Sequence, residues 1–170
     1  MGQILQQRIG ASQRLPSTEE LPVALGVAAG EVGALLEEVL VRHGLTQRQY
    51  HVLRMLRGAE PHGLAHAEIG QRLLSRAPDV TRLMDQLVDR GWAARERSGS
   101  DARVVRHRIT TDGVAVVHAV STPLHEVHLA VRNAIGAEAA DQLIALCERV
   151  IEAVAAHRRP AGRVGARRHG

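Results

Sequence analysis

A chain of 170 residues is long enough to form one domain with a substantial hydrophobic core. All 22 basic residues are arginines, and the formal net charge of +4 favours a polyanionic partner such as nucleic acid. A single cysteine excludes an intrachain disulfide framework, and we find neither a membrane-spanning stretch nor a signal-peptide core, which predicts a cytoplasmic protein without a membrane partner.

The first quarter of the chain is predicted to be an arm followed by one long helix. Residues 1–16 are polar and contain glycine, and we expect them to form a flexible N-terminal arm. Residues 17–44 carry apolar side chains at helical spacing, among them Leu25, Val32 and Leu40. This amphipathic helix is a candidate dimerisation element.

Residues 45–74 contain the best-defined helix start in the sequence. Thr46 and Gln49 have the spacing of a capping box, and Leu45 and Tyr50 flank that box as a hydrophobic staple. After the glycines at 58 and 63, Leu64 is expected to add a minimal strand. Residues 67–74 then form a short helix.

The second helix of this region is predicted over residues 78–90. Pro78 suits the first helical turn, and Gly91 suits the position just past the end. One face is apolar, and the other carries Asp79, Thr81, Arg82, Asp85, Gln86 and Asp89. A short helix that follows a turn and has polar residues near its start can enter the major groove of DNA.

A basic β-hairpin follows the second helix. Residues 98–102 are turn formers, and alternation in residues 103–109 places His107 and Ile109 on one face of a strand and Arg106 and Arg108 on the other. Such a hairpin can lie along the DNA backbone or enter a minor groove. The pattern therefore predicts a helix-turn-helix with a two-stranded basic wing.

Two further helices are predicted in residues 114–157, separated at Gly136, and Pro123 is expected to kink the first of them. The winged region cannot cover the apolar stripes of these helices and of residues 17–44. Packing against a second copy would cover them, which predicts a homodimer. Residues 158–170 are rich in Arg, Gly and Pro and are predicted to be a disordered basic tail.

The central region, residues 45–113, resembles the MarR (multiple-antibiotic-resistance regulator) family of winged-helix transcription factors. The resemblance rests on Leu45-Thr46 with Gln49-Tyr50, on residues 79–83 with Asp85 and Leu87, on Arg90-Gly91-Trp92 with Arg95, on Asp101-x-Arg103, and on Ile109-Thr110-x-x-Gly113. It implies a mainly α fold with N- and C-terminal dimerisation helices, and a homodimer that binds a pseudo-palindromic operator, usually as a repressor released by a small ligand or an oxidant. It also implies that Arg103 reaches DNA and is held by Asp85 and Asp101. Ala65 departs from the pattern, because a capping Ser or Thr is common there.

The candidate DNA contacts lie on the second helix and the wing. Arg82 suits a bidentate contact to guanine, Gln86 is a second candidate, and Thr81 suits a phosphate. Asp79 could cap the helix, orient Arg76 or Arg82, or read cytosine. The full set is Arg76, Asp79, Thr81, Arg82, Gln86, Arg103 and Arg106. The alternative for the helix is an ordinary solvated face, and for the wing arginines general solubility.

The ten histidines raise the question of metal binding. His125 and His128 lie three residues apart on one helix, a spacing that can share a metal ion. The alternatives are surface or interface histidines, or a pH-sensing role. We assign no metal or cofactor, and His125 and His128 are the candidate ligands should a metal bind.

The sequence therefore predicts a dimeric, sequence-specific DNA-binding regulator, which we expect to be a repressor that responds to a small-molecule effector. The family places such ligands between the dimer helices and the winged region, here around Val32, Leu36, His43, Tyr50 and Val117. One alternative is a winged-helix protein-interaction module without specific DNA binding, and another is a zinc- or pH-responsive regulator that uses the histidines. An enzyme is not predicted, because the sequence contains no recognisable catalytic motif.

Overall fold

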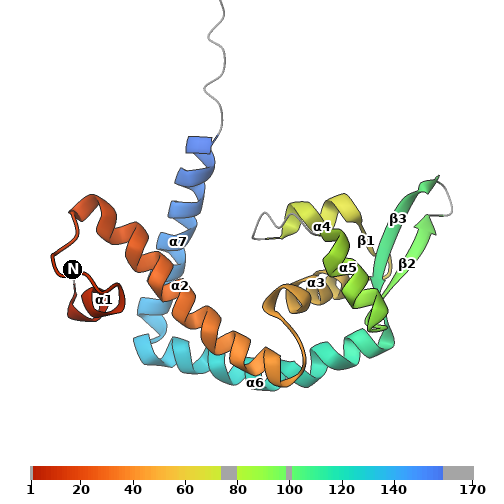
Figure 1. The fold of residues 1–170 in the computed structure, drawn as a ribbon, viewed down its shortest axis with the longest axis horizontal. Helices are drawn as coiled ribbons and strands as arrows, with labels where there is room; N and C mark the ends of the chain where they lie inside the picture. The colour runs from red at the N-terminus through yellow and green to blue at the C-terminus, as the bar shows by residue number, and fades with distance from the viewer. Residues whose placement is uncertain (1, 74–79, 99–100, 159–170) are drawn as a thin grey trace, which may run out of the picture. The chain divides into compact units, whose positions relative to one another are not determined.

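A computed structural model describes residues 2–73, 80–98 and 101–158, excluding the side chains of residues 97–98 and 101–104. Its elements, drawn in Figure 1, are α1 (Gln3–Arg8), α2 (Ser17–Arg42), α3 (Gln47–Gly58), β1 (Leu64–Ala65), α4 (His66–Arg72), α5 (Val80–Asp89), β2 (Ala93–Ser98), β3 (Asp101–Ile109), α6 (Thr111–Ile135) and α7 (Ala137–Arg158). The chain divides into two compact units, Met1–Val127 and His128–Gly170. The mainly α fold with a winged helix-turn-helix is confirmed.

The core of the first unit lies where α3, α4, α5, the sheet and the first turns of α6 meet. Leu53, Ile69 and Met84 are fully buried there, and Leu40 at the end of α2 joins them. The buried face of α5 is formed by Leu83, Met84 and Leu87, as the helical periodicity predicted. Because this apolar face packs against the core, the opposite, polar face of α5 is exposed to solvent.

The wing is part of a three-stranded antiparallel sheet with the order β1-β3-β2. Leu64 pairs with His107, so the minimal strand expected at Leu64 is present. On the other side of β3, Ala93 pairs with Ile109 and Arg95 with His107. The sheet lies beside α4 and α5 (Figure 1). Strand β1 pairs with β3 and directly precedes α4, so it connects the hairpin to the start of α4.

The N-terminal segment contains a helix that the sequence did not predict. Helix α1 lies within residues 1–16, and Arg8 at its end forms an ion pair of 3.2 Å with Glu31 of α2. Helix α2 begins at Ser17 and runs through Pro22.

Among the described residues, α6 alone is long and apolar enough to cross a membrane by length and composition, whereas no such stretch was expected from the sequence. One such helix does not overturn that expectation. Its apolar character has another explanation, because Gly113, Val117, Val120 and Leu124 are buried on the core of the first unit. A core helix of a soluble protein has the same composition, so we attach no membrane role to it.

Within the described residues, the second unit consists of the last turns of α6 and the whole of α7. Arg132 of α6 donates to Asp141 of α7 at 3.0 Å, and Ala140 is buried. The large apolar side chains of α7 are exposed, among them Leu143, Leu146 and Ile151. Residues 159–170, which make up nearly all of the predicted tail, lie outside the described residues.

Candidate nucleic-acid interface

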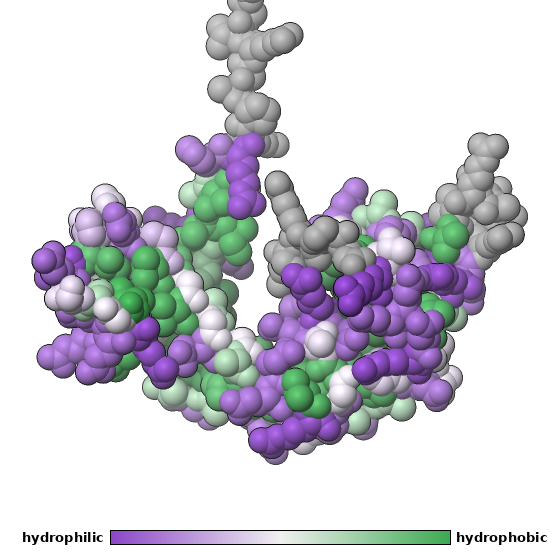
Figure 2. Space-filling view, viewed as in Figure 1, coloured by the Kyte–Doolittle hydropathy of each residue, from purple (hydrophilic) through white to green (hydrophobic). Residues whose placement is uncertain are grey.

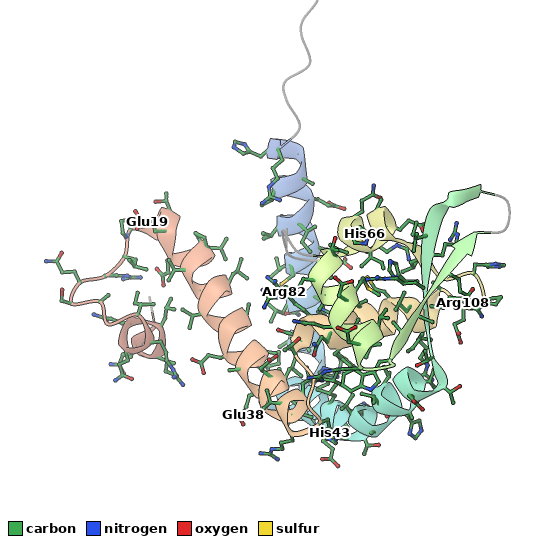
Figure 3. The ribbon with its side chains drawn as sticks, turned by 45° about the vertical axis from the view of Figure 1, so that its right-hand side comes forward. Glu19, Glu38, His43, His66, Arg82 and Arg108 are labelled. Carbon is green, nitrogen blue, oxygen red and sulfur yellow. The ribbon has the colours of Figure 1, made fainter. Side chains whose placement is uncertain are left out.

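The polar face of α5 presents three of the predicted DNA contacts. Thr81, Arg82 and Gln86 are exposed, and Figure 3 shows Arg82 on this helix. Arg82 and Gln86 are four residues apart, so their side chains lie on the same face. The predicted contacts Arg76 and Asp79 lie outside the described residues.

Gln86 is connected to the start of α3. The side-chain oxygen of Gln86 accepts a hydrogen bond of 3.2 Å from Nε2 of Gln49, which is only 5% exposed. Gln49 also completes the predicted capping box: its Oε1 accepts from the backbone N–H of Thr46, and its own N–H donates to Oγ1 of Thr46. Both polar ends of the Gln49 side chain are therefore used.

The described cations of the wing are each paired with a carboxylate. Arg106 lies 3.7 Å from Glu68 of α4 and donates to the backbone oxygen of Gly63 at 3.2 Å. Arg108 pairs with Glu96 across the hairpin at 3.3 Å. These contacts fix the wing to α4 and stiffen the hairpin.

Arg95 links the root of β2 to α5, because it forms an ion pair with Asp85. The resemblance had implied that Asp85 holds Arg103. Asp101 and Arg103 lie in β3, but their side chains are outside the described part of the structure. The described partner of Asp85 is thus another arginine of the wing.

An open cavity of about 800 Å³ lies between α4, α5 and the sheet. Its lining includes His66, Thr81, Asp85, Arg95 and His107. The Nε2 atom of His66 lies 3.4 Å from Oγ1 of Thr81, and Figure 3 places His66 at the start of α4. The rings of His66 and His107 are 5.9 Å apart.

His107 is the buried member of this histidine pair. It is 2% exposed, and its Nδ1 atom has no hydrogen-bond partner among the described residues. Burial, the neighbouring His66 and Arg95 together lower the pKa of His107 from 6.5 to about 4. The ring is therefore neutral at physiological pH.

The five residues predicted to form a ligand pocket differ in how far they are buried. Val117 is buried, Leu36 and Tyr50 are packed against the core, Val32 is half-buried and His43 is exposed. These five residues line neither the cavity beside His107 nor a smaller one formed by His51, Arg54, Met55, Arg72 and Leu73. Within the described residues, His125 and His128 are exposed, and no group of three or more His, Cys, Asp or Glu side chains could hold a metal ion.

Three residues with contacts at this surface were missed by sequence reasoning: Gln49, His66 and Glu68. Gln49 carried a signal for the cap but none for its second contact, because Gln86 lies 37 residues away. Glu68 follows Ala65 by three residues, the spacing of a capping box, and its carboxylate accepts from the N–H of Ala65 at 2.6 Å.

The distribution of polar residues distinguishes this surface from the helices around it. In Figure 2, hydrophilic residues cover much of the visible face of α3, α4, α5 and the sheet, whereas hydrophobic residues gather along the first half of α2. Leu21 and Leu35 of α2 are among the exposed apolar side chains. The polar surface is the one that carries Thr81, Arg82 and Gln86.

Comparisons with known proteins agree with this architecture. A model of the MarR family matches residues 43–104. The transcriptional repressor MprA of Escherichia coli (strain K12) is 27% identical over 106 residues, which are 62% of this chain and 60% of the repressor, so the chain spans less than two thirds of that relative. The S. aureus MepR-DNA complex has the same fold, with a TM-score of 0.71 at 19% identity over 82% of this chain and 99% of that one.

A MarR transcription factor from Planctomyces limnophilus, known from a crystal structure, is more similar in sequence to this chain than MprA or MepR. The identity is 32%, the TM-score is 0.61, and the match covers 80% of this chain and 98% of that chain. Proteins of this family are transcriptional regulators and not enzymes. The chain belongs to the MarR family of winged-helix transcription factors.

Proposed function

We propose that this protein is a transcriptional regulator that binds a pseudo-palindromic DNA operator as a homodimer. The observation that carries the proposal is the exposed row of Thr81, Arg82 and Gln86 on α5, beside a sheet that is ion-paired to α4 and α5. Such a helix fits the major groove, and the adjoining hairpin reaches the flanking backbone or minor groove. Relatives named as repressors support this function.

The contacts divide into those that read bases and those that hold the backbone. Arg82 and Gln86 are assigned to base edges, and Thr81 to a phosphate. Arg76, Asp79 and the wing residues Arg103 and Arg106 complete the interface, with Asp85 and Asp101 orienting the wing. The pairing of Arg106 with Glu68 gives Arg106 a bracing role as well.

The homodimer part of the proposal rests on exposed apolar surface. Leu143, Leu146, Ile151 and Val154 of α7 are each more than 40% exposed in the single chain. A second copy could cover them, and the two-fold symmetry of such a dimer matches a palindromic operator.

The regulator is further proposed to be cytoplasmic and to release DNA when a small molecule binds. The proposed ligand site includes Leu36 and Tyr50, which pack at the edge of the core between α2 and α3. A ligand there would act on the junction of the long helix and the winged region.

The test is a salt-titrated binding assay on the DNA upstream of the protein's own gene. Wild type is compared with Arg82→Ala and Arg103→Ala, and Arg14→Ala serves as the control because Arg14 is an exposed arginine that belongs neither to α5 nor to the wing. We expect Arg82→Ala to weaken specific binding by about 1–3 kcal/mol. Arg103→Ala should reduce the salt dependence by about one phosphate contact.

Binding that ignores sequence, or that is unchanged in both variants, contradicts the proposal. The protein-interaction module would then be the better interpretation. Weakening that is equal in all three arginine variants would indicate only a general charge effect.

A further inference from the structure

A chain of three hydrogen-bonding groups runs from the start of α3 to the exposed face of α5. The backbone N–H of Thr46 donates to Oε1 of Gln49 at 3.0 Å. The Nε2 of Gln49 then donates to Oε1 of Gln86 at 3.2 Å. Gln49 is 5% exposed, whereas Gln86 is exposed. This series of hydrogen bonds through Thr46, Gln49 and Gln86, which we call the relay, begins at a backbone group and ends at a side chain on the proposed DNA surface.

The direction of this relay is fixed at its first step. A backbone N–H can only donate, so the Gln49 group that faces Thr46 must be the oxygen. The other end of Gln49 is then the amide nitrogen, which has no acceptor lone pair. Gln86 must therefore turn its oxygen toward Gln49. Its amide nitrogen, with two N–H donors, is left for a partner outside the protein.

Gln86 lies in the right place to use those donors. It follows Arg82 by four residues on the same face of α5. An unrestrained glutamine can turn either end of its amide to a base and often binds adenine with both. A glutamine whose oxygen is turned back toward Gln49 points its two N–H donors at the base.

We propose that Gln49 is a positioning residue that fixes the amide of Gln86 and so determines which base Gln86 reads. On the contacted strand the preferred base presents acceptors and no amino group in the major groove, which means guanine (O6 and N7) or thymine (O4), whereas adenine carries an amino donor beside its N7 acceptor. This inference rests on the proposed function, because it takes α5 to be the helix that reads DNA.

The substitution Gln49→Glu tests the relay directly. A glutamate keeps an acceptor for the N–H of Thr46, and capping boxes use Glu and Gln alike. It has no N–H to donate, so the amide of Gln86 must rotate, donate its nitrogen to Glu and present its oxygen to the DNA. The preferred base should then be one with an exposed amino group, adenine or cytosine.

The experiment is selection of binding sites from a randomised DNA library by the full-length wild-type and Gln49→Glu proteins. We expect one position in each half-site to change from guanine or thymine to adenine or cytosine, with about a tenfold change in the ratio of affinities for the two bases. The matched controls are Gln86→Ala and the double variant Gln49→Glu/Gln86→Ala. Those two should select the same sites as each other, because the relay has lost its last member. Melting temperatures of all four proteins check that the fold is kept.

Two results overturn the inference while leaving the proposed function intact. In the first, Gln49→Glu is folded and selects the same base as wild type. In the second, Gln86→Ala and the double variant Gln49→Glu/Gln86→Ala select different bases at that position, so the effect of Gln49→Glu does not pass through Gln86. If Gln49→Glu does not fold, Gln49→Ala decides: without the donor that holds Gln86, discrimination must fall at the position that Gln86→Ala identifies, and unchanged discrimination there overturns the inference. A wild-type protein that enriches no sequence overturns the proposed function itself, and this inference with it.

Discussion

The buried ring of His107 makes the stability of the winged region depend on pH. Its pKa is lowered from 6.5 to about 4, mainly by burial and then by His66 and Arg95. Between these two pH values the unfolded chain binds a proton that the folded chain does not bind. The free energy of unfolding is therefore highest above pH 6.5 and falls as the pH is lowered toward 4, by up to about 3 kcal/mol from this group.

The measurement is urea unfolding of wild type and His107→Leu at pH 7 and pH 5. Leucine fills the buried position without titrating, so wild type should lose about 2 kcal/mol more than the variant over this interval. The control is His118→Leu, because His118 lies exposed on α6; this variant should keep the pH dependence of wild type. Equal losses in wild type and His107→Leu would contradict the prediction.

At the scale of helices and strands, the two helices α3 and α4 begin in different ways. The start of α3 has the complete capping box of Thr46 and Gln49. At the start of α4, Glu68 accepts from the N–H of Ala65, but alanine has no side-chain acceptor to return the contact. Ala65 already has the extended backbone of an N-cap, with φ of −71° and ψ of 154°. The substitution Ala65→Ser should therefore raise the free energy of unfolding by about 1 kcal/mol.

Thermal unfolding of Ala65→Ser, with Ala65→Val as its control, checks this prediction. Valine also suits extended backbone but brings no acceptor, so only serine should raise the melting temperature through the cap. A serine variant no more stable than the valine variant would show that the N–H groups at this helix start are already satisfied.

Elements with strong local signals were predictable from the sequence. The capping box at Thr46, the apolar face of Leu83, Met84 and Leu87, and the alternation around His107 each depend on residues close together in the chain. Local geometry alone is enough to link such patterns to a helix or a strand. For this reason the sequence predicted α3, α5 and the wing, and their order along the chain, correctly.

Contacts between distant residues were not predictable in the same way. The composition indicated a basic wing, but it did not indicate that Arg106 pairs with Glu68 or that Gln49 reaches Gln86. These pairs depend on how α3, α4, α5 and the sheet pack in three dimensions. The sequence did not predict α1 because this helix has no side-chain cap and buries no residue. Its ion pair joins Arg8 to Glu31 of α2, a partner that lies far along the chain.

At the scale of the whole molecule, helix α7 leaves apolar surface that the single chain does not cover. Leu143, Leu146, Ile151 and Val154 are between 43% and 67% exposed. Isolated helices are marginally stable in water, and their stability in proteins comes mainly from packing of an apolar face. Exposed apolar patches of this kind mark interaction sites. A homodimer is the economical partner, because it also matches a palindromic operator.

The substitution Leu146→Glu should therefore convert the dimer to monomers, because it places a charge in the proposed interface. The matched control is Ala145→Glu, which adds the same charge to an exposed position one residue away, on a different side of α7. Light scattering after size-exclusion chromatography gives the mass of each variant.

A dimer binds two half-sites as one unit, and the second contact is then intramolecular. The monomeric variant should accordingly bind a full operator about as weakly as it binds a single half-site, whereas Ala145→Glu should keep the preference for the full operator. If Leu146→Glu remains a dimer, α7 is not the interface, and the exposed residues Leu21 and Leu35 of α2 become the surface to alter next.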